Sequence, residues 1–304
     1  RQTKAKTEEY PPITVRGGSL RAIHYKMPIA SAQVKSALLL AGLYAKGTTR
    51  IFEPVKTRDH TERMLEYFGA RIKVKGKIIS LSGRRELTSP GRIEIPADIS
   101  SASFFIAAAI LLPGSRILIR SVGLNPGRTG IIRVLKRMGA DIKVVMRKSF
   151  ACGSEPVGNL IVKSRSIRGI RIFREEIPQL IDELPVLMVV ACFAKGLTVI
   201  EGVEELRVKE TDRIVSMVSN LKKMGACIRV SSSSKGSRKT KEKIIIQGSE
   251  GLRGARVKSF GDHRTAMSMA VAGLAARGRT IIDDFSCVDK SFPGFQKFLK
   301  DVIK

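Results

Sequence analysis

The sequence has no tryptophan, few aromatic residues and no long apolar run. Aromatic residues make up 5% of its 304 residues, which is little for a surface that stacks on nucleic-acid bases. No stretch reaches the roughly 18 apolar residues that indicate a membrane-spanning helix. The first residues, RQTKAKTEEYPP, have no apolar core and no cleavage pattern, so they do not form a signal peptide. They also lack a methionine, from which we expect a fragment.

Cysteines are scarce, and their spacing is not that of a metal site. The four are Cys152, Cys192, Cys227 and Cys287, and no two of them form a CxxC pair. Cys192 lies inside an apolar run, as a buried thiol would. We therefore predict a reduced, cytoplasmic protein with buried thiols and no bound metal.

Acidic residues are also few, with 27 Asp and Glu against 55 Lys and Arg, so the formal net charge is +28. Such a surface could bind nucleic acid, or it could surround a cleft for small, multiply anionic substrates. No nucleic-acid-binding motif is present, but the basic segment 231–243, which we predict to be an exposed hairpin loop, keeps that alternative open. With 43% hydrophobic residues, a chain of this length suggests two globular domains.

What the sequence does contain is internal repetition. A Gly-Ala pair follows a helix-like segment and precedes an alternating, strand-like segment at Gly69, Gly139 and Gly225. A second phrase, an apolar helix followed by a glycine and a short strand, recurs with its glycine at Gly47, Gly114, Gly196 and Gly278. Together the two phrases predict a repeated α/β unit of about 70 to 85 residues, too long for a solenoid repeat.

Polar and charged residues gather at the predicted helix starts. In RVKETDRI, a helix beginning near Val208 would place Lys209 and Arg213 on one face, with Glu210 and Asp212 between them. The other predicted helix starts carry Ser31 and Gln33, Arg58 with Asp59 and His60, Asp182 with Glu183, His263 and Arg264 after an Asp262 cap, and Lys290. Because helix N-termini attract anions, these starts together would form one anion site. Solvated helix starts with ion pairs remain the alternative.

Asp182 and Glu183 precede the most apolar predicted helix. A carboxylate at that position either caps the helix or is a buried base with a raised pKa.

Five of these segments, in this order, resemble the 5-enolpyruvylshikimate-3-phosphate synthase family: ASAQVKSALL, TRDHTERML, RVKETDRI, GDHRTAMS and DKSFPGF. The resemblance extends from about Pro11 to Lys304. It implies transfer of the enolpyruvyl group of phosphoenolpyruvate to the 5-hydroxyl of shikimate 3-phosphate with release of phosphate, in chorismate (aromatic amino acid) biosynthesis. It implies no cofactor and a monomeric enzyme.

For the fold, the resemblance implies an inside-out α/β barrel of the enolpyruvyl transferase type, with two domains built from repeated βαβαββ units. Residues 1–96 would be the later part of the domain on the shikimate-phosphate side. Residues 97–304 would be the second domain without its N-terminal segment.

The resemblance also implies that Ser31, Gln33 and Arg58 hold shikimate 3-phosphate, with Lys35 as a further basic residue of the cleft. Ala32 stands where many members have serine, so one phosphate-binding hydroxyl is absent. The residues implied for the phosphate and carboxylate of phosphoenolpyruvate are Arg213, Arg264 and Lys290.

The implied catalytic residues are carboxylates with basic neighbours. Asp182 would bind the 5-hydroxyl as a candidate general base, and Lys209 would touch both substrates. Glu210 would protonate the enolpyruvyl methylene, and His263 would assist. Glu205 stands where some members have asparagine that contacts the sugar ring.

Two motifs of the family have no counterpart in the chain: the N-terminal Lys, Ser and Arg motif, and an Asn-Ala-Gly-Thr turn followed by arginine. We therefore expect the chain to be inactive alone. The alternatives are the related transferase that acts on UDP-N-acetylglucosamine, whose reactive cysteine loop is not matched here, and a paralogue that keeps the fold without catalysis.

Overall fold

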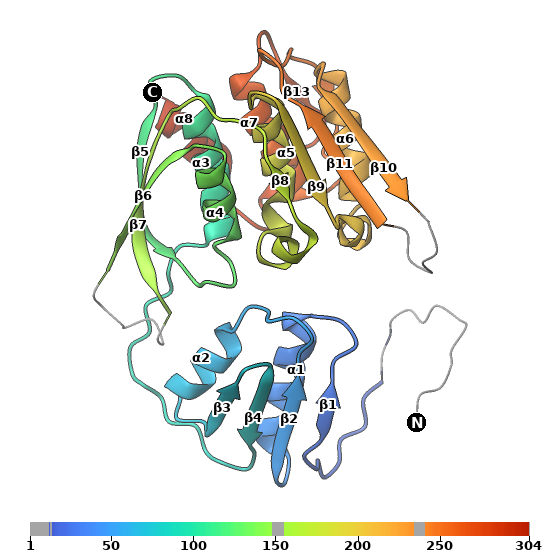
Figure 1. The fold of residues 1–304 in the computed structure, drawn as a ribbon. Helices are drawn as coiled ribbons and strands as arrows, with labels where there is room; N and C mark the ends of the chain where they lie inside the picture. Colours follow the sequence, from blue (N-terminus) through green and yellow to red (C-terminus); the bar gives the residue numbers. More distant parts are fainter. Residues whose placement is uncertain (1–11, 13, 148–154, 234–240, 304) are drawn as a thin grey trace.

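The structure, a computed structural model, describes residues 12, 14–147, 155–233 and 241–303. The chain forms two bodies, drawn one below the other in Figure 1. The elements of the first body are β1 (His24–Lys26), α1 (Ala32–Tyr44), β2 (Thr48–Phe52), α2 (His60–Tyr67), β3 (Ile72–Lys75) and β4 (Ile78–Ser82). Their sheet has the order β1-β2-β4-β3, with β1 parallel to β2 and the other pairs antiparallel.

The second body repeats this arrangement. Its first unit consists of α3 (Ile99–Leu111), β5 (Arg116–Gly123), α4 (Gly130–Arg137), β6 (Asp141–Met146) and β7 (Val157–Lys163). Its second unit consists of β8 (Arg171–Ile172), α5 (Leu184–Cys192), β9 (Leu197–Glu201), α6 (Arg213–Lys223), β10 (Cys227–Ser233) and β11 (Lys241–Gln247). The β8-β9-β11-β10 order matches that of the first body strand for strand, and β5-β7-β6 matches it once the parallel bridge of Ala97 to Val122 is included.

A further unit begins with β12 (Arg256–Val257), α7 (His263–Ala275), β13 (Ile281–Ile282) and α8 (Phe295–Ile303). Short 3-10 helices link several elements: η1 (Arg174–Gln179), η2 (Ile181–Glu183), η3 (Glu204–Val208) and η4 (Ser286–Val288). The predicted repeated α/β unit is therefore present.

The predicted Gly-Ala turns end α2, α4 and α6 in the same way. Gly69, Gly139 and Gly225 have positive φ angles of 81°, 100° and 88°. In the first turn, the Gly69 amide donates to the carbonyl of Glu66 and the Ala70 amide to that of Leu65, each at 2.9 Å, and the other two turns repeat this pair. This hydrogen-bond pattern closes a helix with a left-handed residue and sends the chain back as a strand.

The two bodies have separate hydrophobic clusters. The larger is built from buried residues between Ile99 and Leu299, and the smaller from buried residues between Met27 and Leu81. In the second body, α3 packs on β5 and β7, α5 packs on β11, and α3, α5 and α7 pack on one another, so helices lie between two sheets (Figure 1). No sheet closes on itself in the described part of the chain, and the inside-out barrel and the boundary at residue 96 stay predictions.

Three smaller expectations have mixed outcomes. Cys192 and Cys287 are buried thiols, as predicted, but Cys227 is exposed on β10, and Cys152 lies outside the described residues. The predicted loop 231–243 is wrong at both ends, because β10 continues to Ser233 and β11 begins at Lys241, and residues 234–240 lie outside the described residues. Over the described ranges, no helix has the length and apolarity to cross a membrane.

Candidate anion-binding site

Three arginines from separate elements surround the carboxylate of Asp182. Arg58 Nη1, from the loop before α2, lies 3.4 Å from Asp182 Oδ2. Arg213 Nη1 and Arg264 Nε, from the starts of α6 and α7, lie 3.7 and 3.8 Å from Asp182 Oδ1. Arg264 Nη1 also donates to the Asp182 carbonyl at 3.0 Å. Residues that are far apart in the sequence thus meet at one carboxylate, as the predicted convergence of helix starts requires.

Aspartate caps fix the two helix starts that carry these arginines. Asp212 Oδ1 accepts hydrogen bonds from the amides of Ile214 and Val215, each at 3.0 Å. Asp262 Oδ1 accepts from the amides of Arg264 and Thr265 at 2.8 and 2.9 Å, which confirms the predicted cap. Because a cap satisfies amides that the helix leaves free, each arginine is held at a defined place in the first turn of its helix.

Arg213 is buried and only partly satisfied. Its Nε donates to Asp262 Oδ2 at 2.9 Å and its Nη2 to Glu210 Oε2 at 2.5 Å, while its side chain is 1% exposed. Its Nη1 has no hydrogen-bond partner in the part of the chain that the structure describes. A buried guanidinium donor without an acceptor is costly, so an anion bound beside Asp182 would satisfy it.

Asp182 and Glu183 are adjacent, and their pKa values move in opposite directions. Burial alone would raise the pKa of Asp182, but Arg264, Arg58 and Arg213 outweigh it and hold that pKa below its usual value. Burial raises the pKa of Glu183 to about 7, against a hydrogen bond donated by Ser100 Oγ. The predicted raised pKa is therefore wrong for Asp182 and correct for Glu183. Neither carboxylate caps α5, since the residue at its N-cap, Glu183, makes no capping hydrogen bond.

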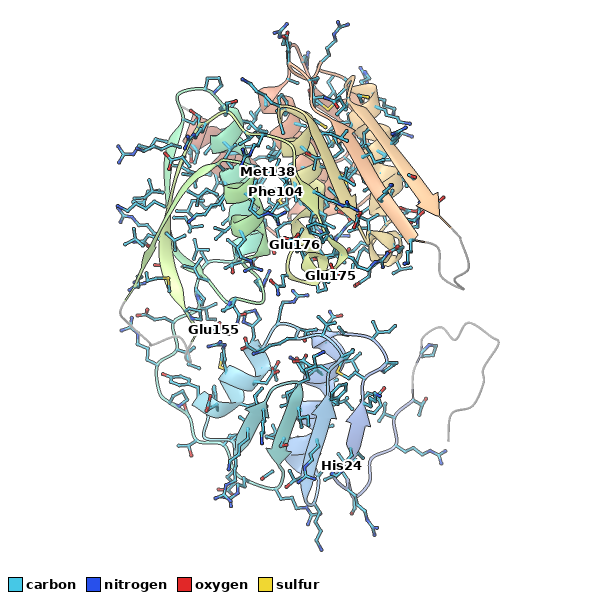
Figure 2. The ribbon with its side chains drawn as sticks, viewed as in Figure 1. His24, Phe104, Met138, Glu155, Glu175 and Glu176 are labelled. Carbon is cyan, nitrogen blue, oxygen red and sulfur yellow. The ribbon has the colours of Figure 1, made fainter. Side chains whose placement is uncertain are left out.

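A second set of contacts joins the start of α2 to the second body. Asn125 Nδ2 donates to Asp59 Oδ1 at 2.6 Å, and His60 Nδ1 lies 2.6 Å from Glu155 Oε1. Figure 2 shows Glu155 where the two bodies meet. These contacts place Arg58, the residue before Asp59, at the boundary with Asp182.

Several residues of the site were not predicted from the sequence. Arg128 Nη2 lies 2.8 Å from Asp98 Oδ1 and donates to Ser100 Oγ at 2.6 Å, so it supports the hydroxyl that contacts Glu183. Asp98 caps α3 just as Asp262 caps α7. The repeat could therefore have indicated Asp98 and Ser100, because they begin the equivalent apolar helix. Nothing in the pattern indicated Asn125.

The start of α6 differs from the prediction. The helix begins at Arg213 and not near Val208, because η3 and an extended residue, Lys209, precede the Asp212 cap. Lys209 therefore does not share a helix face with Arg213. Its Nζ instead lies 2.6 Å from Glu205 Oε1, and no ion pair joins it to Asp182 among the described residues.

Lys35 is not a cleft residue, which corrects the prediction. Its side chain is fully buried, with Nζ 3.1 Å from Glu53 Oε2 and 2.6 Å from Glu62 Oε1. Ser31 is the N-cap of α1, where its Oγ accepts from the Val34 amide at 3.3 Å, and Gln33 is exposed in the first turn.

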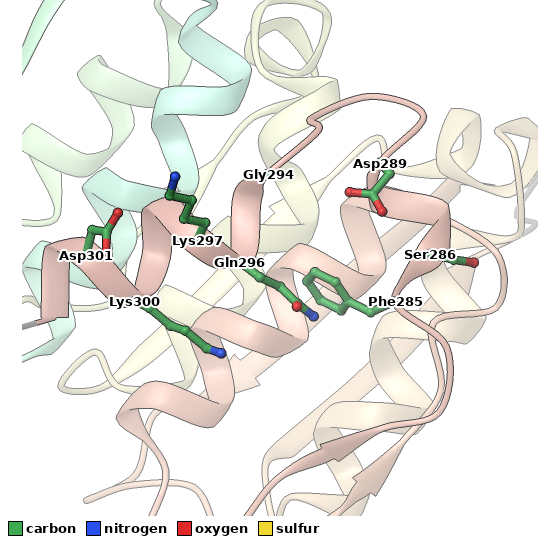
Figure 3. A pocket seen from close by; sticks show the side chains of 8 residues that line it. All are labelled: Phe285, Ser286, Asp289, Gly294, Gln296, Lys297, Lys300 and Asp301. Carbon is green, nitrogen blue, oxygen red and sulfur yellow. The ribbon is translucent and has the colours of Figure 1, made fainter.

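Lys290 is exposed in the turn between η4 and α8, and in the described ranges no ion pair brings it to Asp182. Hydrogen bonds with Ser286 lower the pKa of the nearby Asp284, and the Lys290 charge lowers it further by a smaller amount. Next to it in the chain, Asp289 lines a pocket along α8 with Lys297 and Lys300 (Figure 3), and that pocket shares no residue with the arginine site.

His263 begins α7 beside Arg264. Burial and the Arg264 charge lower its pKa, so the ring is neutral near pH 7. No group of three or more His, Cys, Asp or Glu side chains in the described ranges could hold a metal ion.

Repeated α/β units in two bodies, with guanidinium groups converging on one carboxylate near their helix starts, define a two-body α/β protein with a candidate anion site where the bodies meet. The sequence model of one family, described as EPSP synthase (3-phosphoshikimate 1-carboxyvinyltransferase), matches residues 3–299. The chain belongs to this family.

Curated relatives named 3-phosphoshikimate 1-carboxyvinyltransferase support the assignment. That of Brevibacillus brevis is 48% identical over 294 residues, which are 97% of this chain and 66% of the relative. That of Desulforamulus reducens is 48% identical over 96% of this chain and 65% of its own length. A solved EPSP synthase from Acinetobacter baumannii superposes with a TM-score of 0.82 at 42% identity, covering 93% of this chain and 63% of the other. The chain thus spans about two thirds of the length of these relatives.

Proposed function

We propose that the chain forms most of a site that transfers the enolpyruvyl group of phosphoenolpyruvate to the 5-hydroxyl of shikimate 3-phosphate and releases phosphate. The observation that carries this proposal is the convergence of Arg58, Arg213 and Arg264 on Asp182. Both substrates carry phosphate and carboxylate groups, which guanidinium groups bind with paired hydrogen bonds.

Arg213 and Arg264 bind phosphoenolpyruvate in this proposal. The Nη1 of Arg213 supports the assignment, because it is a buried donor without a hydrogen-bond partner among the described residues and lies beside Asp182, where a bound anion could accept from it. Addition of the 5-hydroxyl to the enolpyruvyl group gives a tetrahedral ketal that keeps both anionic groups. Cations held in place beforehand stabilise it without reorganisation.

Asp182 accepts the proton of the 5-hydroxyl. In the free protein its surrounding arginines lower its pKa and make it a weak base. Bound anions would offset the positive field of those arginines, so substrate binding would raise the pKa of Asp182 and strengthen it as a base.

Glu210 protonates the methylene carbon of phosphoenolpyruvate. Its side chain is 55% exposed and is held by Arg213 at 2.5 Å, so it can face a substrate bound on that arginine. Loss of phosphate from the ketal then needs a proton removed from the new methyl group, which the same carboxylate accepts, while Asp182 returns its proton to the leaving phosphate. His263, neutral near pH 7, assists from the start of α7.

Ser31, Gln33 and Arg58 hold shikimate 3-phosphate from the first body. Lys209 and Lys290 are the remaining basic residues of the proposal, and Lys209 must leave its ion pair to bind a substrate. This means exchanging Glu205 for an anionic ligand.

We further propose that the 304-residue chain alone binds shikimate 3-phosphate as a monomer and does not turn over, since two substrate-binding motifs implied by the resemblance have no match in it. Isothermal titration calorimetry with shikimate 3-phosphate and a phosphate-release assay with both substrates test the two claims separately. Failure to bind shikimate 3-phosphate would overturn the proposed function. Appreciable phosphate release would overturn only the proposed inactivity. Size-exclusion chromatography checks the monomer, and the cytoplasmic location stays a prediction.

A further inference from the structure

A fully buried ion cluster lies in the first body beside the proposed site. The Lys35 ammonium, from the first turn of α1, contacts Glu53 at 3.1 Å and Glu62 at 2.6 Å. Glu53 follows the last residue of β2, and Glu62 lies in the first turn of α2. The three side chains are at most 6% exposed. One ammonium therefore joins a strand end to two helix starts.

Stability alone does not account for this cluster. It places two carboxylates against one cation, and Glu62 Oε2 has no hydrogen-bond partner in the described part of the chain. Buried ion pairs are often no more stabilising than apolar residues of the same size, because the charges lose their water. The cluster is thus better explained by the geometry that it imposes.

That geometry concerns the residues proposed to hold shikimate 3-phosphate. Lys35 donates its backbone amide to the Ser31 carbonyl at 3.1 Å, so the cluster holds the helical turn that carries Ser31 and Gln33. Glu53 Oε2 also accepts from the amide and hydroxyl of Thr57, at 3.2 and 2.9 Å, and Thr57 directly precedes Arg58.

A second link supports the same arrangement. Ser36 Oγ, next to Lys35, lies 2.6 Å from Thr61 Oγ1 in the first turn of α2. The start of α1 and the start of α2 are therefore joined side chain to side chain at two neighbouring points.

We propose that Lys35 is a positioning residue for shikimate 3-phosphate: it holds the turn of Ser31 and Gln33 at a fixed separation from Arg58. It does not touch the substrate. This inference rests on the proposed function for its ligand, but the coupling of α1 to α2 through Lys35 is a property of the free protein. A displacement of substrate-holding groups by about 1 Å can lower activity by about a hundredfold. Loss of the contacts between α1 and α2 should therefore have a large effect on the site.

The test uses the whole chain in three forms. Lys35→Met removes the ammonium but leaves two carboxylates facing each other, so its folding could suffer. A triple variant, Lys35→Met with Glu53→Gln and Glu62→Gln, removes all three charges and is expected to keep the wild-type melting temperature. Lys56→Met is the matched control, because Lys56 is exposed in the same β2–α2 loop.

Calorimetry with shikimate 3-phosphate and hydrogen exchange are the readouts. We expect the triple variant to bind at least about tenfold more weakly than the wild type, with faster exchange in the first turns of both α1 and α2. Lys56→Met should change neither. Wild-type affinity in a folded triple variant would overturn the positioning role. If the wild type itself does not bind, the proposed function fails. Unchanged hydrogen exchange in the triple variant would separately overturn the coupling of α1 to α2 through Lys35.

Discussion

The first body and the second unit of the second body share one sequence phrase and one strand order, yet their helices are buried to very different extents. Every residue of α5, from Leu184 to Cys192, is buried. In α1 only Lys35, Leu39 and Gly42 are buried, while Leu40 and Tyr44 are 51% and 75% exposed. The same apolar phrase thus gives a fully buried helix at α5 and a partly exposed one at α1.

The difference comes from neighbours and not from the helices themselves. Helix α5 packs on α3, α6, α7 and β11, whereas α1 packs mainly on β2 and β4. The local pattern of an apolar run followed by glycine sets where a helix ends and which strand follows. Burial of its outer faces depends on other units, which the pattern of one unit does not describe.

The largest expected effect comes from equivalent positions in these two helices. Val189 and Leu40 each lie seven residues before the glycine of their unit, and they are 0% and 51% exposed. Val189→Asp buries a charge without a partner and should prevent folding. Leu40→Asp should change the free energy of unfolding by less than about 0.5 kcal/mol. Urea unfolding of both variants checks this, and equal losses would contradict the comparison.

The next largest effect comes from Glu183, whose pKa is raised while that of its neighbour Asp182 is lowered. The pKa of Glu183 is raised from its ordinary value of 4.5 to about 7, so this carboxyl ionises at a lower pH in the unfolded chain than in the folded one. Its charge therefore destabilises the fold increasingly between these pH values, by about 3 kcal/mol in full.

Glu183→Gln should accordingly be more stable than the wild type at about pH 8 and equal to it at about pH 4. Glu66→Gln, on the exposed side of α2, is the control and should show no such dependence. Urea unfolding at the two pH values measures both. A gain that is the same at both would show that Glu183 is not a titrating group.

A smaller effect separates the contributions of the two bodies to the proposed site. Arg58→Ala should weaken binding of shikimate 3-phosphate by about ten- to a hundredfold, because it removes hydrogen bonds to a charged group and their free energy corresponds to that change in affinity. Arg264→Ala should weaken phosphoenolpyruvate binding similarly. Arg277→Ala, an exposed arginine just beyond α7, is the control. Calorimetry with each substrate measures both affinities. If each variant lost binding of both substrates, the assignment of Arg58 to shikimate 3-phosphate and of Arg264 to phosphoenolpyruvate would be wrong.

The sequence predicted the fold best where local chemistry determines it. Gly-Ala turns, apolar helices and short strands could be predicted because each follows from a few neighbouring residues. The start of α6 could not, because the residues before it are compatible with helix until Asp212 takes the cap position. The partners of each sheet also depend on contacts across the chain.

For the site, the sequence predicted the residue types and several positions but not their pairing. Arg58, Arg213, Arg264 and Asp182 come together as expected of convergent helix starts. Lys35 was misplaced because a lysine among small residues at a helix start is indistinguishable from a ligand-binding one. Only the positions of Glu53 and Glu62, which tertiary structure sets, identify its partners.

The smallest effect should be the same in both bodies. Gly69 ends α2 beside the small core and Gly225 ends α6 beside the large one, with φ angles of 81° and 88°. An added Cβ would meet nothing within 4 Å at either position, so the cost of Ala is the backbone conformation alone, about 1 to 2 kcal/mol each. Gly17→Ala, equally open but without a positive φ, should cost nothing. Urea unfolding that gave a much larger loss for Gly225 than for Gly69 would mean that these turns depend on the surrounding core, and the distinction between local pattern and tertiary burial would fail.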